Sequence, residues 1–350
     1  MRDYKIEMAT RDRLAGIVAA RVVKSYLTEV RAAIRERRSI TGAGLLIPDV
    51  MLELIRKEAA RDSRLLPFVN HRNVNGVARV PITGAIPEAV WTEMCANLNE
   101  LALTFNQVEV DGYKVGAYIP VCNAVIEDSD VMLANEIVSS LGTGIAKALD
   151  KAILFGTGTK MPTGIVTRLA QTAQPDNWGV NAPAWVDLHS TNIKTLDIDS
   201  THGAEFFEAL VGALGTAKPV YSSDGLFWAM NRKTHLDIMA KALDFNSDGA
   251  LTSATPMLPI LGGSVVEFRE DEIADGDIIG GYGGNYLLAE RAGMQFASSD
   301  AVRFMQDQTV FKGTARYDGM PVGGKAFVIV NYKNTAPTTT KSFAPDVANQ

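Results

Sequence analysis

The sequence predicts an α+β protein built around one long helix, with a two-stranded arm projecting from its core. Three observations support this fold class. An unbroken amphipathic pattern covers residues 128–155, and a polar stretch with a strand-like segment at each end covers 73–113. From about residue 172 onward, short strands alternate with short helices, which is typical of a mixed α/β domain.

The long helix is the clearest local prediction. Its apolar residues recur every three or four positions between Val131 and Ile153, after a polar cap at residues 128–130. Gly156 is expected to end it. Gly142 and Gly144 lie inside the helix, where each costs ~1 kcal/mol relative to alanine. A bend, or the close approach of another backbone, would account for them.

Two alternating stretches, 77–82 and 101–110, predict the strands of the arm. Pro81 restricts the first strand to a sheet edge, and a phase slip at Asn106–Gln107 predicts a bulge in the second. A two-stranded ribbon is only marginally stable by itself. We therefore expect the arm to lie on another subunit.

A basic helix is predicted over residues 11–38, and a short helix begins at Pro48 and ends near Leu66. The first 40 residues carry ten Lys and Arg against five Asp and Glu, although the whole chain has a net charge of −6. These bases can match the helix dipole on a solvated face. The second, less favoured interpretation is an arm that lies near packaged nucleic acid or on a neighbouring subunit.

The second half predicts a helix at 204–214 and a strand that runs into Asn231, which caps the next helix. The continuously apolar residues 327–332 predict a buried final strand. Further short strands are expected at 265–268, 278–279, 286–290 and 294–297.

Composition and motifs exclude several classes of function. The negative net charge argues against wholesale coating of nucleic acid, and no apolar run is long enough to span a membrane. The N-terminus has no apolar core of a signal peptide, and the two cysteines, Cys95 and Cys122, indicate free thiols in a reducing compartment.

No motif in the sequence builds a chemical site. The segment 244–249 opens like a calcium loop, but Thr255 stands where a bidentate glutamate is required, so a polar turn is predicted. The glycines at 156–160 follow a helix, whereas a phosphate-binding loop precedes one, so they predict a helix stop and a turn. The glycines at 280–284 predict a turn between strands. The four histidines are scattered. We therefore predict no catalytic residue, no metal and no cofactor, and a soluble α/β enzyme is the least favoured alternative.

Five phrases, taken with this order of elements, are similar to a known family. They are IPDVMLELIR at 47–56, GAIPEAVWTE at 84–93, NQVEVDGYKVGAYIPVCN at 106–123, DSDVMLANEI at 128–137 and LDKAILFGTGTKMPTGIVTRL at 149–169. Together they resemble the HK97-type phage major capsid protein. The resemblance implies an HK97-like capsid fold with an N-terminal arm, an E-loop β-hairpin, a P-domain that contains the long spine helix, and a mixed α/β A-domain.

The resemblance also implies domain boundaries. They are an N-terminal arm at 1–45, a P-domain at 46–72 and 115–165, an E-loop at 73–114, an A-domain at 166–315, a P-domain return strand at 316–333, and a flexible tail at 334–350.

By resemblance, the chain is expected to be a structural shell protein of a tailed double-stranded DNA phage or prophage. Hexamers and pentamers would form an icosahedral head in the virion after assembly in the host cytoplasm. A separate scaffolding protein, a portal, a maturation protease and non-specifically contacted DNA are the expected partners. The alternative is an encapsulin-like compartment, which shares the fold and encloses protein cargo. Candidate inter-subunit contacts are Trp91, Glu88, Glu93, Phe105, Arg35, Arg37 and Arg38.

Some members of the family join neighbouring subunits through an isopeptide bond between an E-loop lysine and a P-domain asparagine, with a glutamate as base. Here no lysine occurs between Lys57 and Lys114, and no glutamate occurs from Ala301 to Gly319, where Asp307 lies near the expected acceptor position. Both the nucleophile and the base are missing, so no autocatalytic cross-linking is expected.

Assembled particles, boiled in detergent and run on a denaturing gel, should give a single band at the 37.7 kDa of the chain. The expected cause is the absence of a lysine nucleophile in the E-loop. A ladder of covalent oligomers in reducing buffer would contradict the prediction.

Overall fold

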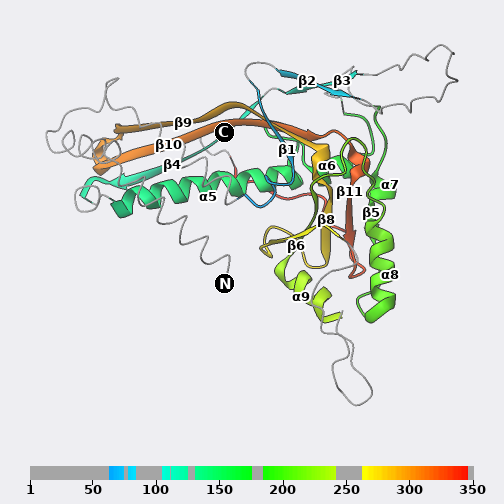
Figure 1. The fold of residues 1–350 in the computed structure, drawn as a ribbon. Coiled ribbons are helices and arrows are strands. Elements are labelled where there is room, and N and C mark those ends of the chain that lie inside the picture. The colour runs from blue at the N-terminus through cyan, green and yellow to red at the C-terminus, as the bar shows by residue number, and fades with distance from the viewer. Residues whose placement is uncertain are drawn as a thin grey trace, which may run out of the picture. The chain divides into compact units, whose positions relative to one another are not determined.

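The computed structural model describes residues 63–74, 78–83, 105–110, 112–124, 131–175, 184–241 and 262–345. These residues divide into two compact units. Unit 1 holds 63–64, 112–124, 131–150 and 292–317, and unit 2 holds the remainder. Three long elements contribute residues to both units (Figure 1): α5 (Val131–Phe155), β9 (Tyr286–Arg303) and β10 (Gln308–Pro321).

Unit 1 is a sheet packed on a helix. Strand β4 (Tyr113–Cys122) pairs antiparallel with β10, from Gln308 opposite Cys122 to Tyr317 opposite Tyr113. Because side chains alternate between the faces of a strand, one face of this pair points toward α5. The core between this face and α5 consists of Val121, Ile137, Leu141 and Phe311, with Ala117 and Ile119 packed against it. The strand order of the sheet is β1-β9-β10-β4, in which β1 (Asn70–Asn73) and the residues 287–290 of β9 that pair parallel with it belong to unit 2.

Unit 2 contains a mixed five-stranded sheet with the order β5-β11-β8-β6-β7. Its strands are β5 (Ile193–Thr195), β11 (Phe327–Asn331), β8 (Asp277–Tyr282), β6 (Leu226–Asn231) and β7 (Ser264–Phe268). Helices α8 (Gly203–Leu214) and α9 (Arg232–Lys241) contribute Phe206, Leu210 and Ile238 to a core cluster of unit 2, which also includes Trp228 and Tyr332. The short elements are α6 (Ile165–Ala170), α7 (His189–Asn192) and the 3-10 turns η1 (Gly283–Asn285), η2 (Phe304–Gln306) and η3 (Gly324–Ala326).

Several local predictions are confirmed. The long helix ends at Phe155, directly before Gly156, and a helix covers 203–214. Asn231 caps α9, because its Oδ1 accepts a hydrogen bond from the Thr234 N–H at 2.6 Å. The predicted helix at 11–38, the polar cap at 128–130 and the loop at 244–255 lie outside the described residues.

The predicted bulge in the arm is wrong. Strands β2 (Ala78–Thr83) and β3 (Phe105–Val110) pair antiparallel without interruption, from Ala78 opposite Val110 to Thr83 opposite Phe105. A change in the phase of apolar residues indicates a bulge only where one face of the strand is buried. These two strands form a sheet of their own, so the polar pair Asn106–Gln107 fits an unbroken ladder.

Three other expectations also require correction. Residues 286–290 and 294–297 belong to one continuous strand, β9, because its pairing continues past the break in apolar residues. Gly280 and Gly281 lie within β8, and the turn begins only at Gly283. A Cβ at Gly281, where φ is +138°, would lie 1.9 Å from the carbonyl oxygen of Ala326, so glycine is required by close strand packing. Residues 63–66 are not helical, so the helix predicted to end near Leu66 does not reach Ser63.

Strand β11 lies in an unexpected sheet. The sequence assigned it to the P-domain as a return strand, yet it pairs with β5 and β8, which come from the predicted A-domain. All five of its residues are buried. A continuously apolar strand indicates burial on both faces, but it does not indicate which neighbours supply that burial.

The first part of the predicted flexible tail makes specific contacts with unit 2. The Asn334 N–H donates to the Leu196 carbonyl at 2.8 Å, and the Thr338 N–H donates to Asp277 Oδ2 at 3.0 Å. Asp277 is buried, and this burial raises its pKa, although the hydrogen bond from Asn331 acts in the opposite direction. Near the end of the described residues, Lys151 Nζ donates to the Ser342 carbonyl at 2.6 Å.

The turn that follows α5 is a helix stop, as the sequence predicts. The Gly156 N–H donates to the Ala152 carbonyl at 2.9 Å, and the Gly164 N–H donates to the Gly156 carbonyl at 2.8 Å. A Cβ at Gly156 would lie 2.1 Å from the Pro162 carbonyl oxygen. The turn therefore closes on itself so tightly that only glycine fits at this position.

Replacing Gly156 with alanine should lower the free energy of unfolding by roughly 2 kcal/mol or more, because the new methyl group overlaps backbone. Gly144→Ala is the matched control. It lies in the same helix, and in the part of the chain that the structure describes no atom beyond the neighbouring helix backbone lies within 4 Å of its added Cβ. It should leave stability unchanged or raise it by up to ~1 kcal/mol. Urea unfolding of the unassembled subunit measures both, and equal losses would contradict the account.

Candidate assembly surfaces

The structure leaves most of the contact residues proposed from sequence untested. Trp91, Glu88, Glu93, Arg35, Arg37 and Arg38 lie outside the described residues. Phe105 begins β3, opposite Thr83, and only its backbone is described. Their roles stay predictions.

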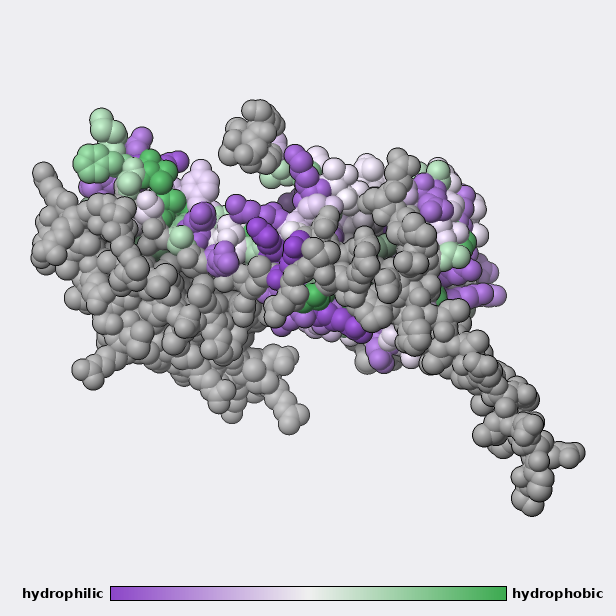
Figure 2. Space-filling model, turned by 90° about the horizontal axis from the view of Figure 1, so that it is seen from above, coloured by the Kyte–Doolittle hydropathy of each residue, from purple (hydrophilic) through white to green (hydrophobic). Residues whose placement is uncertain are grey.

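The clearest uncovered apolar surface is the turn between β9 and β10, residues 302–307, which we call the tip. Val302, Phe304 and Met305 are 74%, 79% and 91% exposed. Single exposed apolar residues are common, but three within four positions on a projecting turn form a contiguous patch. Green side chains gather at the upper left of Figure 2, at the end where Figure 1 shows the β9–β10 turn. The patch has the character of an interaction surface.

Hydrogen bonds hold the tip in one conformation. The Asn123 N–H donates to the Asp307 carbonyl at 3.1 Å, and Asn123 Nδ2 donates to Asp307 Oδ1 at 2.7 Å. Thr309 Oγ1 donates to Asn123 Oδ1 at 2.8 Å. These bonds stabilise the left-handed backbone of Asp307, whose φ is +50°. Asp307, the residue nearest the expected cross-linking position, therefore accepts hydrogen bonds that hold the turn.

A second surface is the face of the β4–β10 pair that points away from α5. Lys114, Tyr118, Lys312 and Arg316 are all exposed on it, and Tyr118 is 60% exposed. In the strand register Arg316 lies opposite Lys114, and Lys312 lies opposite Tyr118. We call these four residues the basic face. Cys122, at the end of the same strand, is exposed and free, as predicted.

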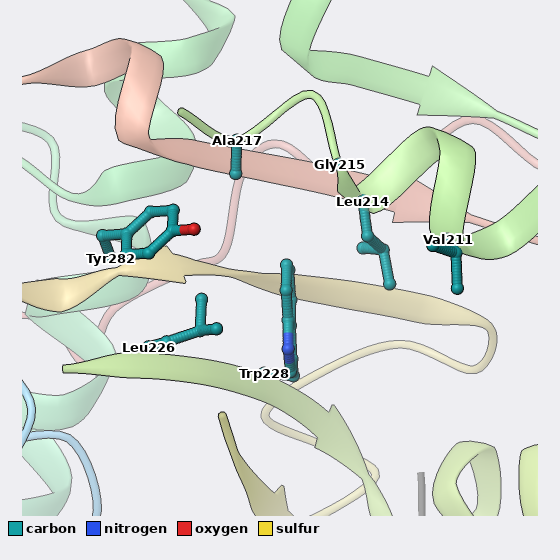
Figure 3. Close-up of a pocket in the computed structure, with 7 residues that line it drawn as sticks. All are labelled: Val211, Leu214, Gly215, Ala217, Leu226, Trp228 and Tyr282. Carbon is teal, nitrogen blue, oxygen red and sulfur yellow. The ribbon is translucent and has the colours of Figure 1, made fainter. Parts of the chain in front are cut away.

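One small cavity in unit 2 is mainly apolar (Figure 3). It has a volume of about 110 Å³ and is lined by Val211, Leu214, Gly215, Ala217, Leu226, Trp228 and Tyr282. The indole N–H of Trp228 donates to the Gly262 carbonyl at 3.0 Å, so the tyrosine hydroxyl is the polar side-chain group left in the lining. Ligand pockets usually measure about 300 Å³ or more and contain several convergent polar groups. The cavity does not resemble an active site.

In the part of the chain that the structure describes, no group of three or more His, Cys, Asp or Glu side chains could hold a metal ion. Within the same residues, no helix is long and apolar enough to cross a bilayer.

Sequence reasoning missed the tip. Val302, Phe304 and Met305 lie in the segment 301–319, which was considered only for the residues of the cross-linking reaction. The signal available was the cluster Phe304–Met305 next to polar turn residues, which is typical of a hairpin end. Lys114 and Tyr118 are an even number of positions apart, as are Lys312 and Arg316, so each pair is expected on one face of its strand.

One family model and several solved structures match the chain. A family model described as the phage capsid family matches residues 43–332. The capsid of an empty GTA particle is 19% identical, with a TM-score of 0.52, and the match covers 77% of this chain and 90% of that one. A structure of Mycobacterium phage Bobi is 16% identical, with a TM-score of 0.51 and coverage of 78% and 91%. At these identities the structural likeness concerns the fold. No curated protein matches the chain.

Replacing Phe304 and Met305 together with serine should reduce self-association of the protein at least severalfold, because the exposed patch loses its apolar surface. The melting temperature of the dissociated subunit should stay unchanged, since neither side chain packs in the core. Light scattering and thermal unfolding measure the two effects. A lower melting temperature, or unchanged association, would contradict the assignment.

Proposed function

The chain belongs to the phage capsid family, and we propose that it serves as the major capsid protein of a tailed double-stranded DNA phage or prophage. The observation that carries this proposal is the extent of the family match, which runs from residue 43 to residue 332 and so includes both compact units. The chain has an HK97-like capsid fold, and its place is in the virion.

Many copies assemble into hexamers and pentamers that close an icosahedral head. The uncovered surfaces of the single chain support such a role. The tip exposes Phe304 and Met305, and the basic face exposes Tyr118 together with three cations. A shell subunit retains surfaces of this kind because neighbouring copies cover them.

The role is structural and not catalytic. The surfaces above supply contacts, and the one cavity described lacks convergent titratable groups. The two-stranded sheet of β2 and β3 forms the base of the E-loop, which we propose to lie on an adjacent copy. Assembly in the host cytoplasm involves a separate scaffolding protein, a portal and a maturation protease. The packaged DNA is contacted without sequence preference.

Negative-stain microscopy and light scattering of the purified protein test the function directly. Shell assembly predicts capsomers of five or six subunits, or closed particles with masses in the megadalton range. The N-terminal 62 residues should be retained, because they include the expected arm at 1–45. A stable monomer or dimer over a range of salt and protein concentrations would overturn the proposal. Particles filled with protein and devoid of DNA after expression with the remaining phage genes would also overturn it.

A further inference from the structure

Residues 334–345 follow strand β11 at the end of the described chain, and they contain no helix or strand. They begin with a turn at Asn334, whose backbone is left-handed with a φ of +51°. Asparagine tolerates this conformation better than most residues. The Asn334 N–H donates to the carbonyl of Leu196, the residue directly after β5, at 2.8 Å. We call residues 334–345 the strap.

The middle of the strap is attached to a buried carboxylate. Asp277, the first residue of β8, is 1% exposed, and its Oδ2 accepts a hydrogen bond from the Thr338 N–H at 3.0 Å. Its Oδ1 accepts a hydrogen bond from Nδ2 of Asn331 at 2.7 Å. Pro337, directly before Thr338, is buried. Since a buried carboxylate is stable only with hydrogen-bond donors around it, Asp277 holds the strap at this point.

The far end of the strap contacts helix α5. Lys151, near the end of α5, donates through Nζ to the Ser342 carbonyl at 2.6 Å, and the same Nζ lies 4.8 Å from the centre of the Phe343 ring. An ammonium group at this distance from an aromatic ring is attracted to it. Beside these residues, Lys341 Nζ donates to the Asp271 carbonyl at 3.1 Å. The strap therefore connects the end of β5, the start of β8 and the end of α5, all within unit 2.

The strap buries little apolar surface. Pro337 is its one buried residue, and most of the others are exposed. By contrast, all five residues of β11, which comes shortly before the strap, are buried. Segments with few buried apolar contacts open locally at a lower free energy than the core on which they lie. The strap can thus detach while β11 and its sheet stay folded.

Detachment changes the surroundings of two charged groups. Asp277 loses the Thr338 donor and gains contact with water, so the burial that raises its pKa is reduced, together with the opposing effect of the Lys341 charge. Lys151 loses its contacts with Ser342 and the neighbouring ring. The strap then no longer ties the end of α5 to the five-stranded sheet.

We propose that the strap is a releasable fastener that holds the end of α5 to the five-stranded sheet, with Asp277 as its anchor. The structure shows the closed state. In the open state the strap swings out from the turn at Asn334, and the end of α5 gains freedom. A partner that binds the open strap, or the surface beneath it, shifts the balance because it binds one state better than the other. The inference concerns the single chain and does not depend on shell assembly.

Two variants of the full-length, dissociated subunit test this proposal. Lys151→Met removes the contacts at the α5 end, and Thr338→Pro removes the N–H that Asp277 accepts. Trypsin cleavage after Lys341 reports opening, because this side chain must leave the Asp271 carbonyl to enter the protease. Each variant should be cleaved there at least tenfold faster than the original chain. Mass spectrometry of the released peptide 342–350 measures the rate.

Lys147→Met is the matched control, because Lys147 is exposed one turn earlier in α5 and the strap bonds described above do not involve it. It should be cleaved after Lys341 at the original rate. Hydrogen exchange gives a second readout. Amides 152–155 should exchange at least about threefold faster in Thr338→Pro than in the original chain, because this variant changes α5 only through the strap.

Cleavage after Lys233 and hydrogen exchange within α9 report unfolding of unit 2 as a whole, and both should stay unchanged. Unchanged cleavage after Lys341 in either variant, or unchanged exchange at 152–155, would overturn the inference. If α9 opens faster by the same factor as the strap, the strap is an integral part of the fold and the inference is also overturned. None of these measurements requires particles, so a chain that fails to assemble contradicts the proposed function alone.

Discussion

The packing of α5 against the β4–β10 strand pair is the interaction on which the rest of the structure depends. Val121 and Phe311 from the strands meet Ile137 and Leu141 from the helix. Because side chains alternate along a strand, burial of this face determines which residues point away from it. Tyr118 and the three cations of the basic face are exposed for this reason. A shift of one residue in the register would bury them and expose the core.

Hydrogen bonds to the backbone of the turn that follows α5 help to fix the end of this helix. The Thr163 N–H donates to the Gly319 carbonyl at 2.8 Å, and the Tyr286 hydroxyl donates to the Thr163 carbonyl at 3.0 Å. Burial raises the pKa of Tyr286, so its hydroxyl stays protonated and remains a donor throughout the physiological range. The glycine-rich turn thus joins the helix end to β9 and β10, which makes it an architectural feature and not a phosphate site.

Local periodicity predicted much of this fold, and the reasons for the failures are physical. The apolar stripe of α5, the cap at Asn231 and the two strands of the arm are encoded in short stretches of sequence. The sheet that contains β11 is not encoded in this way. The apolar residues of β11 indicate that the strand is buried, but they do not indicate which strands pair with it. The exposure of Phe304 at the tip was also not predicted, because an apolar residue that contacts another subunit cannot be distinguished in sequence from a core residue. The basic face could be read from alternation, but the opposition of Lys114 and Arg316 required the register.

In the part of the chain that the structure describes, the core beside α5 is buried, the basic face carries cations without ion-pair partners, and the tip carries exposed apolar side chains. A cryo-electron microscopy reconstruction of assembled particles tests this most directly. We expect Phe304 and Met305 of one copy to lie against a neighbouring copy. A reconstruction in which the tip is exposed to solvent would contradict this expectation.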